Sequence, residues 1–217
     1  MFEWLQRTCK LQISVTRSIT ELEGSGVFRE LKPGSFIYQY RQALDPLVCQ
    51  EMIDRFEANP HHQVEGRIGQ GASIEPNMKR STDLRISGRE DWQDIDEALQ
   101  QSLTLGLSAI AGIHPFFGVN RFHDIGYNLQ RTEVGDFYHW HIDSGPGDFT
   151  KRQLVAIWYL NDCLGPGGET EFYFQDVSMR PEEGTLILFP PFWTHLHRGN
   201  KLESGIKYIA TTWICCE

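Results

Sequence analysis

The sequence predicts an α+β protein that is mainly β, with helices in its first half and a double-sheet jelly roll or barrel in its second. After residue 123, short strand-like segments follow one another closely, separated by turns such as Gly165-Pro166-Gly167-Gly168. Short strands at close, regular spacing are typical of barrels and jelly rolls. The 217 residues, 40% hydrophobic and 23% charged, suit one globular domain with a sizeable core.

The first 60 residues contain three predicted elements. Leu11–Ile19 alternates moderately and is a candidate outer strand, while Ser35–Arg41 is a stronger strand candidate because its aromatic residues share one face. Leu44–Asn59 is predicted to be a helix, because Asp45 can cap its first turn and Pro46 suits the first helical position. A proline directly after this segment ends the helix.

The stretch His61–Ser81 is predicted to be a long loop, since it holds three glycines and a proline and has no sustained period. Loops of this length are often lids or binding loops. Together with the turn Ser144–Lys151, it is therefore a candidate lid over a site. The alternative is a merely disordered connection.

A second helix is predicted from Glu90 to Ile113, with acidic residues in its first turn, where the helix dipole favours them. Its apolar residues recur every three or four positions, which predicts packing on a sheet. They are Trp92, Ile95, Leu99, Leu103, Leu107 and Ile110.

Six strands are predicted in the second half of the chain. They are His123–Thr132, Asp136–Ile142, Gln153–Leu160, Glu169–Phe174, Gly184–Phe189 and Ile206–Ile214. We therefore expect one domain, residues 1–217, made of an N-terminal flank of strands and support helices (1–120) and a jelly-roll core (121–217).

The charge balance and the cysteines limit the class of protein. A net charge of −9 disfavours a partner bound mainly through phosphates, such as a nucleic acid. The five cysteines are odd in number and form no Cys-x-x-Cys pair, so reduced thiols are expected. The N-terminus lacks the apolar region of a signal peptide, and no apolar run approaches the roughly 18 residues of a membrane span. We therefore expect a cytoplasmic protein.

One short pattern in the strand-like run before residue 144 suggests a metal site. His141 and Asp143 are two residues apart, so on a strand their side chains share a face. An imidazole and a carboxylate placed in this way can bind one metal ion together with a third ligand. By itself the pair favours a surface strand end with a solvated aspartate over a metal site.

Three segments in order resemble the 2-oxoglutarate- and Fe(II)-dependent oxygenases, specifically the prolyl 4-hydroxylase-like branch. They are Phe137 to Asp143, Ala156 to Asn161 leading to Gly167 to Phe172, and Leu188 through His197 to Tyr208. The resemblance covers about residues 123 to 216. It implies a double-stranded β-helix, a cupin-like jelly roll, as the core.

The resemblance implies that His141, Asp143 and His197 are the catalytic iron ligands. His197 is preferred over His195, because in this family a glycine and a basic residue follow the distal histidine by about eight and ten residues. Gly205 and Lys207 stand at these distances from His197. We expect His195 to share a strand face with His197, and His139 with His141, as neighbours of the ligands.

The resemblance also implies the residues that bind the co-substrate. Lys207 matches the basic residue that pairs with the distal carboxylate of 2-oxoglutarate, and Tyr159 stands where some relatives place a phenol on this carboxylate. Thr211 and Trp213 share a strand face with Lys207 and are expected beside it. Tyr138 is expected either to line the pocket or to pack.

One position departs from the family pattern. Many relatives carry a tyrosine nine or ten residues before the first iron histidine, where this chain has Thr132 and Arg131.

The resemblance implies a hydroxylase that uses Fe(II), 2-oxoglutarate and O2, with ascorbate as a further candidate cofactor. The expected product of the co-substrate is succinate with CO2. The expected partner is a peptide, protein or free amino acid with prolyl as the favoured residue, and neither a membrane nor a nucleic acid. Two alternatives are an oxidative demethylase of alkylated nucleic acid and a non-catalytic jelly-roll module that binds metal.

Overall fold

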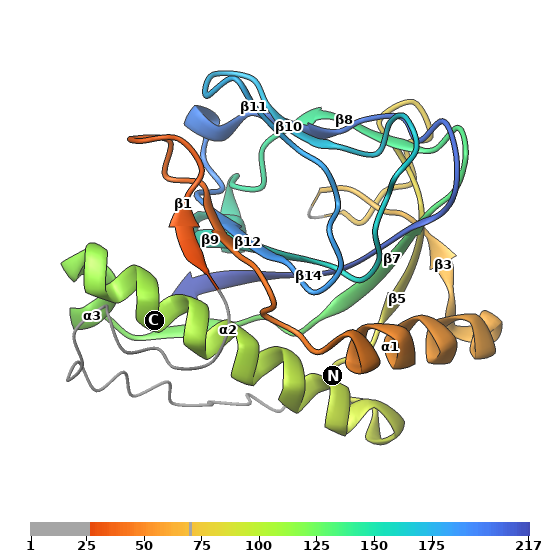
Figure 1. The fold of residues 1–217 in the computed structure, drawn as a ribbon, viewed down its shortest axis with the longest axis horizontal. Coiled ribbons are helices and arrows are strands. Elements are labelled where there is room, and N and C mark those ends of the chain that lie inside the picture. Colours follow the sequence, from red (N-terminus) through yellow and green to blue (C-terminus); the bar gives the residue numbers. More distant parts are fainter. Residues whose placement is uncertain (1–26, 70) are drawn as a thin grey trace.

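The computed structural model describes residues 27–69 and 71–217. In this part of the chain the strands form two antiparallel sheets, one of nine strands and one of five, that face each other (Figure 1). Helices cover the outer face of the larger sheet. The mainly β class and the jelly-roll core predicted from the sequence are confirmed.

The nine-stranded sheet combines strands from both halves of the chain. Its order is β1-β2-β12-β9-β14-β7-β5-β3, with β6 also paired to β14. Strands of the first 85 residues therefore flank the later strands on both sides. In chain order they are β1 (Phe28–Glu30), β2 (Tyr38–Tyr40), β3 (Val64–Glu65), β5 (Thr82–Arg85), β6 (Phe122–Asp124), β7 (Asn128–Thr132), β9 (Arg152–Tyr159), β12 (Leu186–Phe189) and β14 (Lys207–Cys216).

The five-stranded sheet has the order β11-β10-β13-β8-β4. Its strands are β4 (Lys79–Arg80), β8 (Phe137–His141), β10 (Thr170–Phe172), β11 (Val177–Met179) and β13 (His197–Gly199). The chain passes from this sheet to the larger one between β4 and β5, through Ser81 alone.

Two long helices lie on the outer face of the larger sheet. The first is α1 (Pro46–Ala58), and its cap is as predicted, because the Asp45 carboxylate accepts from the Leu47 N–H at 2.8 Å. The second is α2 (Gln93–Ile113). The remaining helical segments are α3 (Pro115–Val119) and the 3-10 turns η1 (Pro60–His62), η2 (Glu90–Trp92), η3 (Gly147–Lys151) and η4 (Trp193–His195).

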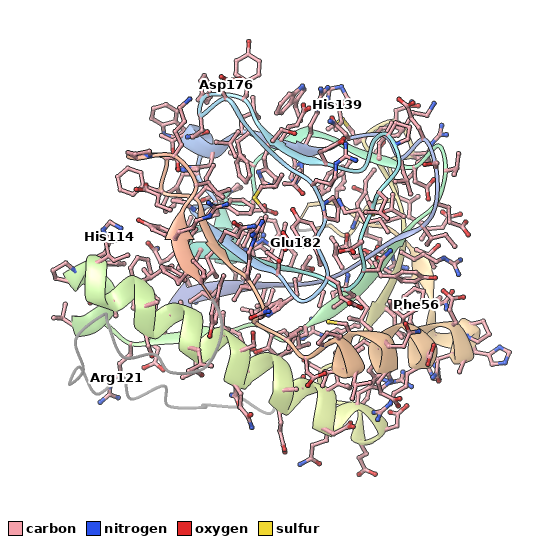
Figure 2. All side chains as sticks on the ribbon, in the orientation of Figure 1. Phe56, His114, Arg121, His139, Asp176 and Glu182 are labelled. Atoms are coloured by element: carbon pink, nitrogen blue, oxygen red, sulfur yellow. The ribbon has the colours of Figure 1, made fainter. Side chains whose placement is uncertain are left out.

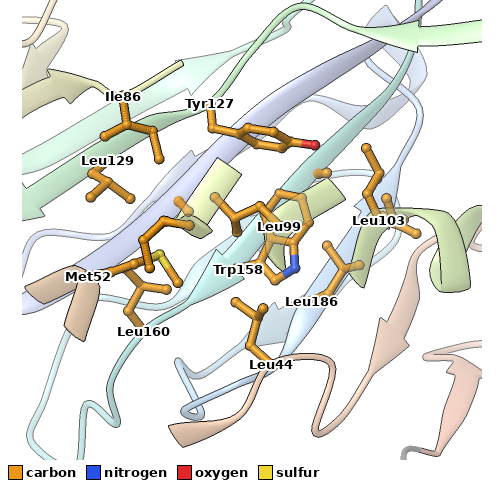
Figure 3. Packing of buried hydrophobic residues seen from close by; sticks show 14 of the residues in the cluster. Leu44, Met52, Ile86, Leu99, Leu103, Tyr127, Leu129, Trp158, Leu160 and Leu186 are labelled. Atoms are coloured by element: carbon orange, nitrogen blue, oxygen red, sulfur yellow. The ribbon is translucent and has the colours of Figure 1, made fainter. Parts of the chain in front are cut away.

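The larger core lies between these helices and the sheet. All six residues of the predicted α2 stripe are at most 3% exposed, so the predicted packing face is confirmed. In Figure 3, Leu99 and Leu103 of α2 meet Trp158 of β9 and Leu186 of β12. Burial of apolar area of this kind contributes about 25 cal/mol per Å².

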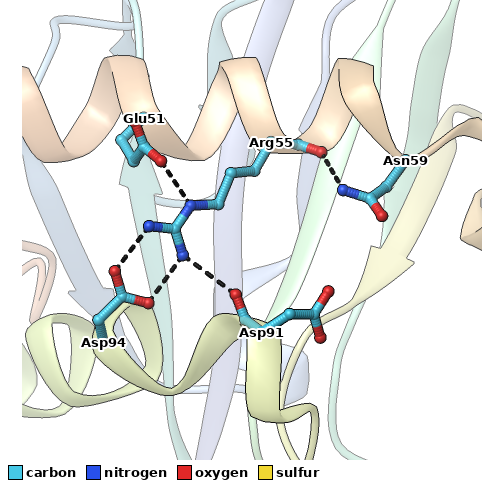
Figure 4. A network of polar contacts seen from close by, with 5 residues as sticks. All are labelled: Glu51, Arg55, Asn59, Asp91 and Asp94. Atoms are coloured by element: carbon cyan, nitrogen blue, oxygen red, sulfur yellow. Dashed lines mark hydrogen bonds and ion pairs between the residues drawn. The ribbon is translucent and has the colours of Figure 1, made fainter.

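A polar network joins α1 to α2 at the protein surface. The Arg55 guanidinium donates to both carboxylate oxygens of Asp94 at 2.7 Å, to Glu51 at 2.6 Å and to the Asp91 carbonyl at 3.1 Å (Figure 4). These contacts hold the N-terminal end of α2 beside the last turn of α1.

Some predicted boundaries differ from the structure. Phe36 has φ 55° and is 47% exposed, so the strand predicted from residue 35 begins at Tyr38. The segment His123–Thr132 divides into β6 and β7 at Gly126, where φ is 85°. The predicted loop 61–81 contains η1, β3 and β4, and the short strands β11 and β13 were not predicted. The strand predicted at Leu11–Ile19 lies outside the described residues.

The described cysteines Cys49, Cys163, Cys215 and Cys216 are free thiols, and the first three of them are buried. This agrees with the expectation of reduced thiols. Among the described residues, the helices are too short or too polar to cross a bilayer.

Candidate metal centre

Two neighbouring strands of the smaller sheet bring two histidines together. In the register of β8 and β13, His197 lies opposite His141. Asp143 follows β8 after one further residue. The N–H groups of Asp143 and Ser144 donate to the Pro191 carbonyl at 3.1 and 2.9 Å. The segment that leads into β13 therefore holds the turn that carries the carboxylate.

The three side chains meet at one point. The His197 Nε2 atom lies 3.2 Å, and the His141 Nε2 atom 4.0 Å, from the same Oδ2 oxygen of Asp143. One potential ligand atom from each residue lies within 4.8 Å of the others, a spacing at which they can bind a single metal ion. His197 and Asp143 are only 3% and 9% exposed.

The hydrogen bonds of the imidazoles fit a metal. The Nδ1–H groups of His141 and His197 donate to the carbonyls of His139 and His195, at 2.8 and 2.9 Å. In the neutral rings this leaves an Nε2 lone pair on each histidine, and both lone pairs are directed to a carboxylate oxygen. Three acceptors in close contact need a cation between them, and metal-binding histidines are usually held by a second-ring N–H in this way.

The pKa values of the cluster agree with this assignment. Burial, with the nearby His197, lowers the pKa of His141 to about 3, so its ring is neutral and able to bind a metal. Burial alone would raise the pKa of Asp143, but the close contact with His197 and the charges of the neighbouring groups outweigh burial and keep this pKa below its ordinary value. The carboxylate is therefore ionised.

The structure separates the ligand histidines from their neighbours. His195 lies in η4 and not on a strand face with His197, contrary to expectation. Its Nε2–H donates to the Ser35 carbonyl and its Nδ1 accepts from Thr194, both at 2.9 Å, so neither nitrogen is available to a metal. His139 is exposed at the periphery of the molecule (Figure 2) and does not line the pocket.

A β-bulge explains the position of His139. Between two paired positions, β13 advances by two residues and β8 by three, from Tyr138 to His141. The extra residue breaks the alternation of β8, as bulges do. Tyr138 consequently lines the pocket, and its ring stacks on that of His141 with centroids 3.4 Å apart and planes at 12°.

Lys207 lies in the same pocket as the three ligands. It is 5% exposed, and burial lowers its pKa to about 8. Its ammonium donates to the Gly168 carbonyl at 2.7 Å, and it forms no ion pair with an acid of the described chain. Gly168 itself has φ 81°, and a Cβ added to it would lie 2.8 Å from Leu202, so a larger residue would disturb this carbonyl.

Alternate residues of β14 line the pocket, so the predicted shared face is confirmed for Lys207, Thr211 and Trp213. Tyr159 lies one layer behind the pocket wall. Its hydroxyl donates to the Thr170 hydroxyl at 2.8 Å, and Thr170 is the one that lines the pocket. All of the predicted residues except Tyr159 line the pocket, and the ring of Tyr159 lies behind the wall with its centre 5.6 Å from the Lys207 ammonium.

Arg152 was missed from the sequence. It is 6% exposed, and its guanidinium carbon lies 3.7 Å from the ring centre of Phe149 and 4.1 Å from that of Trp213. It also donates to the Asp143 carbonyl at 2.7 Å. Arg152 therefore ties the metal-ligand turn to the pocket wall. Its sequence position carries no motif that would have singled it out.

The positions that depart from the family pattern have separate roles. Thr132 lines the pocket beside Lys207, its partner in the register of β7 and β14. Arg131 points away and binds both oxygens of Glu57 at 2.9 Å. Gln130, which was also missed, lines the pocket and donates to Thr211 at 3.4 Å.

Comparisons with known proteins agree with this site. The family model described as 2OG-Fe(II) oxygenase superfamily matches residues 127–215. A PKHD-type hydroxylase of Synechococcus sp. (strain CC9902) is 32% identical over 99 residues, which cover 44% of this chain and 43% of that protein. The protein Probable prolyl 4-hydroxylase 9 of Arabidopsis thaliana is 25% identical over 194 residues, which cover 76% of this chain and 64% of that one. The chain thus matches less than two thirds of either relative.

Solved structures share the fold. A prolyl hydroxylase of Trichoplax adhaerens, in complex with a hypoxia inducible factor peptide, has a TM-score of 0.70 at 16% identity, covering 84% of each chain. The viral collagen prolyl hydroxylase of Paramecium Bursaria Chlorella virus-1, in complex with 2-oxoglutarate, has a TM-score of 0.63 at 20% identity. That match covers 85% of this chain and 98% of the viral one.

Fold and site together define a jelly-roll protein with a metal site of two histidines and one carboxylate. The chain is similar to members of the 2-oxoglutarate- and Fe(II)-dependent oxygenase superfamily, and the relatives that it matches include a PKHD-type hydroxylase and a probable prolyl 4-hydroxylase. Members of this superfamily use Fe(II), 2-oxoglutarate and O2. The chemistry of the donor set described above fits the metal.

Proposed function

We propose that the protein is a hydroxylase of a prolyl or other uncharged amino-acid side chain, in a peptide or protein, dependent on Fe(II) and 2-oxoglutarate. His141, Asp143 and His197 bind the metal and leave part of its coordination sphere open. When bound, the iron with 2-oxoglutarate and O2 oxidises an unactivated C–H bond and releases succinate and CO2. The protein supplies binding, orientation and the exclusion of water.

The observation that carries the proposal is the buried ammonium of Lys207. An ammonium taken out of water without a counter-ion is costly, and this one contacts the Gly168 carbonyl and lies 5.6 Å from the centre of the Tyr159 ring, neither of which carries a negative charge. A dicarboxylate whose other end reaches the metal would supply the missing charge. A site that had lost its co-substrate would have no reason to keep such a cation.

The other pocket residues have supporting roles. Thr211 and Thr170 provide hydroxyls in the same pocket as Lys207 that can bind a carboxylate. Trp213 and Tyr138 provide apolar walls. The Arg152 contact with the Asp143 carbonyl keeps the carboxylate ligand in place.

The charge of the pocket favours an uncharged substrate. Among its cations, Lys79 is paired with Asp83 and Lys207 is reserved for the co-substrate, and its one lining carboxylate, Asp143, is directed to the metal. A lysyl, arginyl or methylated cationic side chain would therefore find no carboxylate to pair with in a partly desolvated site. A prolyl ring is neutral, and the aromatic wall made by Phe137, Tyr138 and Trp213 suits it.

The alternatives have less support. A net charge of −9 disfavours a nucleic-acid substrate. A module that only binds metal would not need a buried, unpaired lysine in the same pocket.

The first experiment is anaerobic titration of Fe(II) and 2-oxoglutarate into the purified protein, followed by addition of O2. We expect the charge-transfer absorption of bound 2-oxoglutarate, then succinate. Asp143→Ala should remove both signals. Protein that shows neither signal while fully folded and loaded with Fe(II) would refute the proposal.

The two histidines of the Thr194–His197 segment provide a matched pair of variants. His197→Ala should abolish the absorption and the turnover. His195→Ala should retain both, because its nitrogens bind Ser35 and Thr194 and not the metal.

A peptide panel tests the substrate. Proline-containing peptides should stimulate succinate release, whereas peptides that present lysine in place of proline should not. Equal stimulation by the two sets would contradict the charge argument and leave only the oxygenase chemistry.

A further inference from the structure

A buried ion pair between Lys79 and Asp83 lies where the chain crosses from the smaller sheet to the larger one. Lys79 belongs to β4 of the smaller sheet and Asp83 to β5 of the larger sheet. The Lys79 ammonium lies 2.8 Å from the Asp83 Oδ2 atom, and the two side chains are 5% and 11% exposed. The Ser81 hydroxyl donates to the other carboxylate oxygen at 2.7 Å. Both ends of the pair are thus fixed.

The surroundings of the Lys79–Asp83 ion pair are tightly packed. The Gly66 N–H donates to the Ser81 carbonyl at 2.8 Å. A side-chain carbon added to Gly66 would lie 2.3 Å from the Ser81 hydroxyl and 3.0 Å from the Lys79 Cε atom. The ammonium of Lys79 therefore has little freedom to move.

The ring of Tyr138 connects the Lys79–Asp83 ion pair to the metal centre. In the register of β4 and β8, Lys79 lies opposite Tyr138, and its ammonium is 5.4 Å from the centre of the Tyr138 ring. A cation at this distance is attracted to the face of the ring. The Tyr138 ring in turn lies flat on the imidazole of His141. Lys79, Tyr138 and His141 form a continuous stack on the pocket wall.

We infer that Lys79 and Asp83 are positioning residues for the metal ligand His141 and act through the ring of Tyr138. The inference rests on the metal centre of the proposed function. The hydrogen bond to the His139 carbonyl fixes one ring nitrogen of His141, and the stacked Tyr138 fixes the plane of the ring. Groups that orient a ligand in this way raise metal affinity, typically by 10- to 100-fold.

The test uses Co²⁺ alone as the probe, because its d–d absorption reports coordination geometry without turnover. Lys79→Met keeps the length of the side chain and removes the charge, but leaves Asp83 unpaired. The double variant Lys79→Met/Asp83→Asn removes both charges and keeps an oxygen that accepts from Ser81. We expect both variants to bind Co²⁺ about tenfold or more weakly than the wild type, with an altered d–d spectrum.

Three controls separate positioning from stability. The double variant should regain, in the metal-free protein, the melting temperature that Lys79→Met loses. Lys79→Arg should restore Co²⁺ affinity. Arg131→Met should leave it unchanged, because Arg131 is paired with Glu57 and lies 5.7 Å from the centre of the Phe56 ring, away from the pocket.

A double-mutant cycle tests whether Lys79 acts on the metal centre through the ring of Tyr138. Tyr138→Leu should weaken Co²⁺ binding, and adding Lys79→Met should weaken it no further, because the lysine acts through the ring. Wild-type Co²⁺ affinity and spectrum in the Lys79→Met/Asp83→Asn protein would overturn the inference and leave the metal centre intact. Absence of Co²⁺ binding by the wild type would overturn both.

Discussion

The two faces of the nine-stranded sheet differ in what they bury, although they are built from the same strands. Toward the helices, β9 and β14 present residues such as Trp158 and Ala210, and this side packs with α1 and α2 as one apolar core. Toward the smaller sheet, alternate residues of β14 are Lys207 and Thr211, which line the pocket. Burial of apolar residues on the helix-facing side stabilises the fold, whereas burial of polar groups on the pocket side opposes folding.

The difference shows where function is to be sought in such a sheet. A buried apolar residue needs no partner, whereas a buried charge needs one. On the helix-facing side the packing is complete within the chain. On the pocket side the cation of Lys207 and the three acceptors of the metal centre are left for partners that the chain does not provide. The first two predictions below test whether stability and binding divide between the faces in this way.

The largest effect is expected on the helix-facing side. Leu99→Ala removes a fully buried side chain of α2 and should lower the free energy of unfolding by about 2–5 kcal/mol. Chemical denaturation measures this loss. Metal affinity, measured well below the melting temperature, should be unchanged. A large loss of metal affinity in the folded variant would show that the two faces are coupled.

On the pocket side the expected pattern is reversed. Lys207→Met should raise the KM for 2-oxoglutarate roughly 30- to 150-fold, equivalent to about 2–3 kcal/mol of lost interaction with a charged group. The same variant should be at least as stable as the wild type, because it removes a buried charge. Steady-state kinetics and denaturation measure the two effects. A destabilised variant with an unchanged KM would contradict the division between the faces.

The same lysine should make co-substrate binding depend on pH. Because burial lowers the pKa of Lys207 to about 8 in the unloaded protein, its charged form is lost as the pH rises above that value. The affinity for 2-oxoglutarate should then fall by up to about tenfold per pH unit. The unfolded lysine keeps its proton to about pH 10.4, so the free energy of unfolding of the unloaded protein should rise over the same window. Lys207→Arg should remove the pH dependence of binding between pH 7 and 9.5.

The smallest effect is expected at the surface network of Figure 4. Arg55→Ala removes contacts whose side chains are 27% exposed for Arg55 and 61% for Asp94. Exposed ion pairs contribute little, so the free energy of unfolding should fall by at most about 1 kcal/mol. Denaturation of this variant beside Leu99→Ala gives the comparison. A loss as large as that of Leu99→Ala would mean that the network, and not the core, holds the helices.

Sequence patterns that depend only on neighbouring residues predicted much of this fold. The helix after Asp45 and the apolar stripe of α2 follow from capping and periodicity, and both are confirmed. β11 and β13 have three residues each, so they carry too little pattern to be recognised without their partners in the sheet. For the same reason the crossing through Ser81 could not be predicted.

At the metal centre, sequence reasoning was limited because it assumed that side chains alternate regularly between the two faces of a strand. It placed His141 and Asp143 together correctly, but it also placed His139 with them, because nothing in the sequence indicates the bulge of β8. It could not distinguish His195 from His197 either, since η4 turns the chain between them. Lys79 is about sixty residues from the ligand that it approaches, and only the folded sheets bring the two together.

The flanking strands of the larger sheet bear on how the chain can be shortened. The region that matches the family model starts at residue 127, yet β2 pairs with β12 and β5 pairs with β7. A fragment cut at that boundary would carry bare backbone donors and acceptors along the free edges of β12 and β7, which are templates for self-association. Crystallisation or library designs based on the matched block should therefore retain residues 27–126 as well.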